Sequence, residues 1–147
     1  MRFAILLILA ALVSAATFRA RAQAPATGTA PAVNWVLPIF TDREGYRALT
    51  LRGSSVRPAE GSGIAVTDLN ITIFSGDAAA RVDTVLLSQD AVFLPKENRA
   101  FGEKTVRVIH DEIDVTGEKW TYDHAGKKVS IQENVRVVYR APFKLPL

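Results

Sequence analysis

Hydrophobic and polar residues alternate along much of the chain after residue 48. The clearest stretch spans residues 65–73, where Asp68, Asn70 and Thr72 interrupt the apolar positions. A period of two over this length predicts a half-buried β-strand. The face expected to point inward carries Ala65, Thr67, Leu69, Ile71 and Ile73. The same alternation returns over residues 129–139 and predicts a second strand of this kind.

A repeat underlies this pattern. Residues 84–110 align without a gap to residues 113–139, at an offset of 29 (84 to 113), and Asn98 then falls on Lys127. A weaker copy covers residues 51–73, at an offset of 35 (51 to 86). Turn residues divide each copy at 57–63, 95–98 and 123–126, so each copy predicts strand, turn and strand. Such repeats usually form a supersecondary unit that stacks on its own copies.

The segments between the copies add few elements. Residues 33–40 are apolar, but Pro38 cannot donate to a sheet ladder and restricts this segment to an edge strand or a flap. Residues 74–83 are expected to form a loop. No long amphipathic helix is apparent, and the predicted fold class is all-β.

Glycines inside the strand pattern predict irregularities in it. Gly102 and Gly117 indicate β-bulges or close backbone approaches. Val115 and Trp120 differ in parity, so a bulge near Gly117 would let both side chains face inward.

The N-terminal segment has the features of a secretory signal peptide. Met1-Arg2 is basic, residues 3–16 are apolar or small, and Ala20-Arg21-Ala22 supplies a cleavage site. We therefore expect residues 1–22 to be a signal peptide, or a short membrane anchor if cleavage does not occur. Residues 23–33 are expected to be a flexible linker, and residues 34–147 the β domain.

Composition restricts the possible partners. Hydrophobic residues make up 48% of the chain, and it contains no cysteine, so core packing alone must hold the domain together. The 18 Lys and Arg exceed the 15 Asp and Glu, but Arg2, Arg19 and Arg21 lie in the leader. The remainder has no net charge, which removes the main support for binding to nucleic acid or to an anionic membrane.

No catalytic constellation is apparent. Gly61-Ser62-Gly63 lacks the spacing of a nucleophile elbow, and neither His110 nor His124 has a triad partner at a specific spacing. The cluster from His110 to Asp114 could supply metal ligands, but a solvated connector explains it better, because neighbouring side chains on a strand point to opposite faces. We expect no catalytic residue, no metal and no cofactor.

The apolar interior offers two interpretations. These residues either fill a core, which is their commonest role, or line an open trough in which each buried acyl methylene would gain about 0.8 kcal/mol. The candidate ligand-binding residues of such a trough are Leu51, Val56, Leu69, Ile71, Ile73, Leu86, Phe93, Val106, Val108, Trp120, Tyr122, Ile131, Val135 and Val137.

Residues 49–139 resemble a known family. The motifs around Trp120-Thr121-Tyr122-Asp123 and Asn134-Val135-Arg136-Val137 are similar to those of the lipopolysaccharide-transport periplasmic proteins. These proteins form the OstA-like superfamily, with A-type bridge members and C-type inner-membrane-associated members. The resemblance leaves the choice between the two types open.

This resemblance implies an open, twisted, antiparallel β-jellyroll in the periplasm, whose trough shelters the acyl chains of lipopolysaccharide or lipid A. It also implies edge-to-edge stacking with other lipopolysaccharide-transport proteins, for which residues 33–40 and 135–139 are the candidate edges. The energy would come from an inner-membrane ABC transporter complex, so the chain itself would need no catalytic residue.

Two other functions stay open at this point. One is a carbohydrate-binding β-sandwich that uses Trp120 and Tyr122 as an exposed stacking platform. The other is a structural assembly module of the cell envelope that associates through its strand edges.

Overall fold

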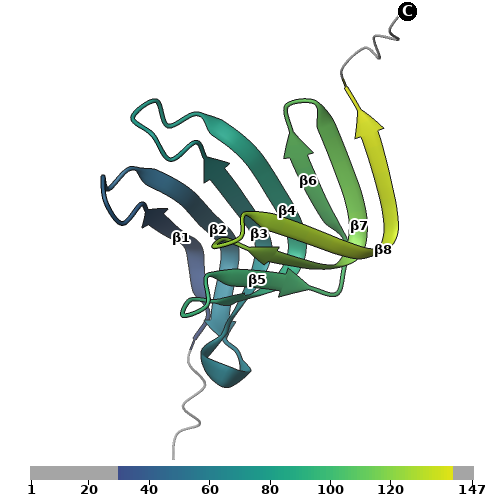
Figure 1. Ribbon diagram of the computed structural model, residues 1–147. Coiled ribbons are helices and arrows are strands. Elements are labelled where there is room, and N and C mark those ends of the chain that lie inside the picture. The colour runs from purple at the N-terminus through teal and green to yellow at the C-terminus, as the bar shows by residue number, and fades with distance from the viewer. Residues whose placement is uncertain (1–29, 141–147) are drawn as a thin grey trace, which may run out of the picture.

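Eight β-strands and one short 3-10 turn form residues 30–140, which are the residues that the computed structural model describes (Figure 1). The predicted leader, most of the predicted linker and residues 141–147 lie outside this range. The elements are β1 (Ala32–Phe40), β2 (Arg47–Pro58), η1 (Glu60–Ser62), β3 (Ile64–Phe74), β4 (Val82–Leu94), β5 (Arg99–Gly102), β6 (Val106–His110), β7 (Ile113–Asp123) and β8 (Lys128–Tyr139). The predicted all-β class is confirmed, and the arrangement agrees with a β-jellyroll.

All strand pairs are antiparallel. Strands β1 to β4 are neighbours in chain order, and β7 pairs with β8. β5 and β6 occupy one position in the sheet, because both pair with β4 on one side and with β7 on the other. These four strands therefore form a closed ring of pairings. Within residues 30–140, β1 pairs only with β2 and β8 only with β7, so these strands are the two edges of the sheet. The predicted edge position of residues 33–40 is confirmed.

The sequence repeat corresponds to successive hairpins. β4 with β5 and β6 forms one copy, and β7 with β8 forms the next. The correspondence extends to the backbone of the turns, where the aligned residues Asn98 and Lys127 both adopt left-handed conformations, with φ of 48° and 47°. The predicted strand-turn-strand units are confirmed. β1 begins at Ala32, two residues before the expected start of the domain at Asn34.

The long strands bend at a common line and divide the sheet into two layers that face each other (Figure 1). The β6 layer consists of β6 with residues 35–40, 47–53, 69–74, 82–88, 113–117 and 135–139. The β5 layer consists of β5 with residues 55–58, 64–67, 90–94, 119–123 and 128–133. At the bend, four strands carry a residue with a left-handed φ, namely Asn34, Asp68, Lys119 and Asn134.

The bend corrects one prediction about β3. Leu69 and Ile71 are buried as expected, but Ala65 and Thr67 lie on the outer face, and Val66 is buried instead. The cause is Asp68, whose φ of 51° interrupts the alternation of side chains. The strict alternation in the sequence therefore did not reveal that the inward-facing positions change from even-numbered to odd-numbered residues halfway along the strand.

Gly102 and Gly117 allow neighbouring strands to approach closely at the bend, as predicted. A Cβ atom on Gly102 would lie 2.7 Å from Trp120 Nε1, and one on Gly117 would collide with Ile131 Cγ2. The pairing register of β7 with β8 shifts between Thr116 and Glu118. This irregularity lets Val115 pack against the core while Trp120 is buried in it, which confirms the predicted bulge.

Candidate functional site

One row of apolar side chains crosses the inner face of the β6 layer from edge to edge. The registers of successive strand pairs align these residues, and directly opposed residues share a face. The row runs Leu37, Leu51, Ile71, Leu86, Val108, Val115 and Val137. Leu51, Ile71 and Leu86 are at most 1% exposed, whereas Val137 on the edge strand β8 is 45% exposed. The interior of the roll therefore leads without interruption to an exposed apolar edge.

The β5 layer covers the middle of this row. Its inward residues include Val66, Phe93, Trp120 and Tyr122, all of them buried and in one cluster with the row. Trp120 is 1% exposed, and its indole Nε1 finds no hydrogen-bond partner within residues 30–140. The centre of the roll is thus packed by its own side chains.

The predicted trough residues fall into three groups. Ten of them are buried and form the core, so the predicted trough is filled over most of its length. These ten are Leu51, Val56, Leu69, Ile71, Leu86, Phe93, Val106, Val108, Trp120 and Tyr122. Ile73 and Ile131 are partly buried and pack against the core, while Val135 and Val137 are exposed on β8. Only these last four positions are accessible to a ligand without a change in the packing.

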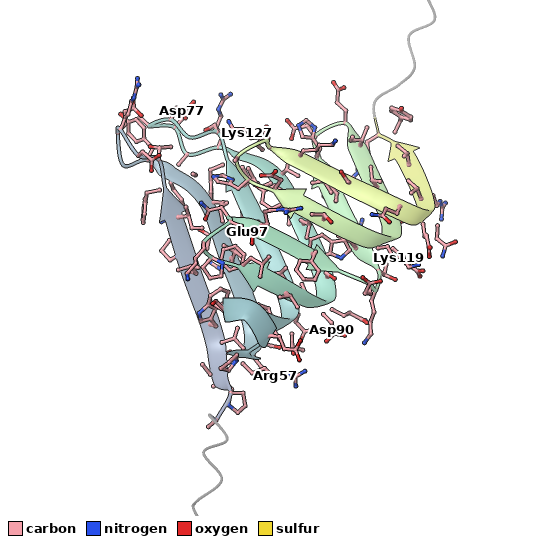
Figure 2. All side chains as sticks on the ribbon, turned by 60° about the horizontal axis from the view of Figure 1, so that its bottom comes forward. Arg57, Asp77, Asp90, Glu97, Lys119 and Lys127 are labelled. Atoms are coloured by element: carbon pink, nitrogen blue, oxygen red, sulfur yellow. The ribbon has the colours of Figure 1, made fainter. Side chains whose placement is uncertain are left out.

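A cavity of about 320 Å³ opens between the layers beside Ile73. Its apolar wall comes from Ile73 on β3, Tyr122 on β7 and Val129 on β8. Charged groups line its mouth, among them Asp77 and Lys127, which lie at the same end of the molecule (Figure 2). This volume is at the lower end of the range for small-molecule sites. An amphipathic ligand could place an apolar end inside it and a polar end at the mouth.

Several inward residues were missing from the predicted set. Trp35, Leu37 and Ile39 on β1 are partly buried and pack against the core, as does Val129 on β8. The β1 residues occupy alternate positions, but the polar residues that would reveal this alternation are nearly absent from residues 33–40. Val129 lies directly opposite Tyr122, a relationship that depends on the register of β7 with β8.

Tyr122 and His124 form a hydrogen-bonded pair beside this cavity. Tyr122 Oη lies 2.8 Å from His124 Nδ1. Burial raises the pKa of Tyr122 to about 12, and burial also lowers the pKa of His124, with help from the charge of Lys127. At neutral pH the phenol and the imidazole are both neutral, and the ring nitrogen that carries the proton decides which of the two donates. A phenol with so high a pKa is a poor general base at neutral pH, and the pair is best understood as a structural contact.

The burial of the two aromatic residues also decides one functional alternative. Trp120 is 1% and Tyr122 is 3% exposed. A sugar ring stacks only on an aromatic face that it can reach, so the expectation of an exposed Trp120 and Tyr122 platform is wrong.

An ion-pair cluster marks the outer surface near β8. Arg107 Nε donates to Asp114 Oδ1 at 3.0 Å, and Arg140 Nη2 donates to Asp114 Oδ2 at 2.8 Å. Hydrogen bonds from Arg107 and then from Arg140 hold the pKa of Asp114 well below its usual range. The same contact raises the pKa of Arg107. Asp114 is therefore ionised at any physiological pH.

The cluster from His110 to Asp114 is divided by this arrangement. Asp114 bonds to the two arginines, whereas His110 Nε2 lies 3.7 Å from Asp83 Oδ1. Residues 30–140 contain no group of three or more His, Cys, Asp or Glu side chains placed to hold a metal ion. The same residues include no helix long and apolar enough to cross a membrane.

Comparison with protein-family models gives no match, and comparison with curated proteins gives none either.

Proposed function

We propose that this chain is a non-catalytic, periplasmic component of lipopolysaccharide transport that holds acyl chains of lipid A at the open side of its β-roll. The observation that carries the proposal is the apolar row of the β6 layer, which leads from the buried Leu51 to the exposed Val137 on a free strand edge. A surface of this kind gives an apolar chain a continuous path between the interior and a neighbouring molecule.

The size of the accessible site sets how the ligand would bind. The cavity of about 320 Å³ beside Ile73 accommodates part of one acyl chain. Further chains would lie along Ile131, Val135 and Val137, or between the layers after these move apart. Each methylene removed from water contributes about 0.8 kcal/mol, so partial insertion already gives useful affinity.

The two free edges support the partners in the proposal. β1 and β8 each expose one side of their backbone, and an unpaired edge can accept a further strand. Other lipopolysaccharide-transport proteins would pair there, and an inner-membrane ABC transporter complex would supply the energy. Pro38 in β1 interrupts the donors of that edge, which favours β8 as the longer docking edge.

A lipid-binding assay tests the proposal with two neighbouring residues. Val137 and Val138 are 45% and 44% exposed, and they lie on opposite faces of the same strand. We expect Val137→Asn to weaken binding of a lipid A analogue, kept below its aggregation concentration, and Val138→Asn to leave it unchanged. Tryptophan fluorescence and thermal unfolding report the binding.

Saturating analogue without any change in fluorescence or melting temperature would contradict the proposal. The structural assembly module is the second candidate, because the filled centre of the roll and the two free edges favour it. That function predicts association that depends on protein concentration and no response to the lipid.

A further inference from the structure

The outer face of the β6 layer points away from the core, and Thr50 is the one buried residue of the two registers that define it. Two neighbouring registers define it, since directly opposed residues share a face and the buried row lies on the other face. The first register runs Val36, Arg52, Asn70, Leu87, Arg107, Thr116 and Arg136. The second runs Pro38, Thr50, Thr72, Val85, Ile109, Asp114 and Val138.

This outer face is basic, although the chain without its leader is neutral. Arg52, Arg107 and Arg136 lie in one register, and Asp114 is the single acid of the two registers. Arg140 joins the same surface through its bond to Asp114. Of these four arginines, Arg107 and Arg140 contact the Asp114 carboxylate, whereas Arg52 and Arg136 lie elsewhere in the first register.

The outer face of the β5 layer has a different charge pattern. Its basic residues are paired with or lie beside acids: Lys104 Nζ lies 2.5 Å from Asp90 Oδ2, and Arg99 Nη1 lies 3.5 Å from Glu97 Oε2. Arg57 and Asp90 line one shallow groove on this face, and Figure 2 shows both toward the same end of the molecule. The basic residues of the β5 layer are thus matched by nearby acids, whereas the two registers of the β6 layer hold three arginines and one acid.

Apolar side chains lie between the arginines of the β6 layer. Val36 and Val138 are 53% and 44% exposed, while Val85, Leu87 and Ile109 are half-buried. These residues point away from the core, so the core does not explain them. Exposed apolar area mixed with basic groups is typical of protein surfaces that lie on lipid headgroups.

We infer that the outer face of the β6 layer docks on an anionic lipid membrane surface. The arginines are two or three strand positions apart, which at about 4.8 Å per strand separates them by roughly 10 to 14 Å. They would contact separate phosphate groups, and the valines and isoleucine between them would enter the headgroup region. A nucleic acid would use the arginines but gain little from these aliphatic side chains, so charge and apolar pattern together favour a membrane.

This inference does not depend on the proposed transport function. Acyl chains would bind on the inner face and at the β8 edge, whereas the membrane would contact the opposite face. Vesicles free of lipopolysaccharide therefore test the docking alone, and failure of either proposal leaves the other intact.

The absence of cysteine makes a site-specific test direct. Thr116→Cys places a single thiol between Arg107 and Arg136, and Ser130→Cys places one on the outer face of the β5 layer. Each full-length variant is labelled with an environment-sensitive fluorophore and mixed with vesicles of phosphatidylglycerol and phosphatidylcholine. We expect the Thr116→Cys label to be protected from an aqueous quencher and the Ser130→Cys label to stay accessible. Thr72→Cys gives a second probe of the same face if Thr116→Cys does not fold.

Paired charge variants separate docking from general electrostatics and from insertion of the leader. Near an anionic surface each arginine contributes about a fivefold gain in binding. Arg52→Gln with Arg136→Gln should therefore raise the lipid concentration for half-maximal protection about 25-fold. Arg57→Gln with Arg99→Gln removes the same charge from the β5 layer and should change this lipid concentration less than twofold.

Three results would overturn the inference. One is equal protection of the two labels, because the leader or a nonspecific contact would then position the chain. Another is equal loss of protection in the two double variants. The third is full protection on vesicles of phosphatidylcholine alone, which would exclude the requirement for anionic lipid.

Discussion

Val108 on β6 lies directly opposite Val115 on β7, and this pair is where the buried interior of the roll becomes accessible. Val108 belongs to the buried core, whereas Val115 is half-buried, and the next residue of the row, Val137, is exposed. The apolar row thus changes from core to surface within three strands. The inner face therefore combines a core that stabilises the fold with an edge that can bind.

Truncation along this row should reveal the gradient directly. Leu51→Ala removes a side chain that is 1% exposed and should destabilise the protein by about 2–5 kcal/mol. Leu37→Ala, its partner on β1, lies in the same row but is only partly buried, and should cost clearly less. Val137→Ala should change the free energy of unfolding by at most about 0.5 kcal/mol. Urea denaturation measures all three, and equal losses for Leu51→Ala and Leu37→Ala would contradict the gradient.

Gly102 should be intolerant of even a methyl group. A Cβ atom there would meet the Trp120 indole nitrogen at 2.7 Å and the Asp90 carbonyl oxygen at 2.8 Å. Neither atom is the end of a flexible chain, so Gly102→Ala should destabilise the fold by about 1–3 kcal/mol. Gly126→Ala is the matched control, because its nearest contact would be an ordinary 3.8 Å. Chemical denaturation compares the two variants, and similar stabilities would contradict the close packing at Gly102.

Trp120 should be shielded from solvent even though it lies on a strand of an open roll. In a Trp35→Phe background, the remaining fluorescence should resist acrylamide quenching, because Trp120 is 1% exposed. Unfolding in urea should abolish this protection and provides the control. Free access of acrylamide to Trp120 in the folded protein would return the stacking platform to consideration.

The sequence predicted the fold better than the site, for physical reasons. Alternation, turn residues and the repeat are local signals, and they indicated strands, hairpins and the bulge near Gly117. At Asp68 one backbone torsion angle changes which alternate residues of β3 face the core, and the alternation in the sequence cannot reveal this. Whether Leu86 or Ile73 reaches a ligand depends on what the facing layer covers, and no local pattern contains that information.

Surface charge shows the same limit. The net charge without the leader argued against an anionic partner, yet Arg52, Arg107 and Arg136 gather on one face because strand registers align them. Composition counts charges, whereas binding depends on where the fold places them. The neutral total is compatible with a basic face when the other faces hold matched pairs.

Asp114 should contribute to stability in a pH-dependent manner. Its pKa in the folded protein lies below that of the unfolded chain, about 3.9, because Arg107 and Arg140 stabilise the carboxylate. The contribution is therefore fully present above the unfolded pKa and is lost as the pH falls through that value toward the folded pKa. Asp114→Asn should be less stable than the natural chain at pH 7, and the difference should shrink on acidification. Urea denaturation across this range measures it, and a difference that does not vary with pH would contradict the ion-pair explanation.

His124 should weaken the fold in mild acid, in a window separate from that of Asp114. Burial lowers the pKa of His124 in the folded protein below the unfolded value of about 6.5. The folded state then binds fewer protons than the unfolded state, so stability is complete above pH 6.5 and declines as the pH falls through that value. The imidazolium form has protons on both ring nitrogens, so it cannot accept a hydrogen bond from the Tyr122 hydroxyl, whose oxygen lies 2.8 Å from Nδ1. His124→Gln should remove the decline between about pH 6.5 and 5, where carboxylates still remain ionised. His110→Gln is the control, since His110 ends β6 and its Nε2 lies 3.7 Å from Asp83 Oδ1, and an equal effect of the two variants would rule out the Tyr122 contact as the cause.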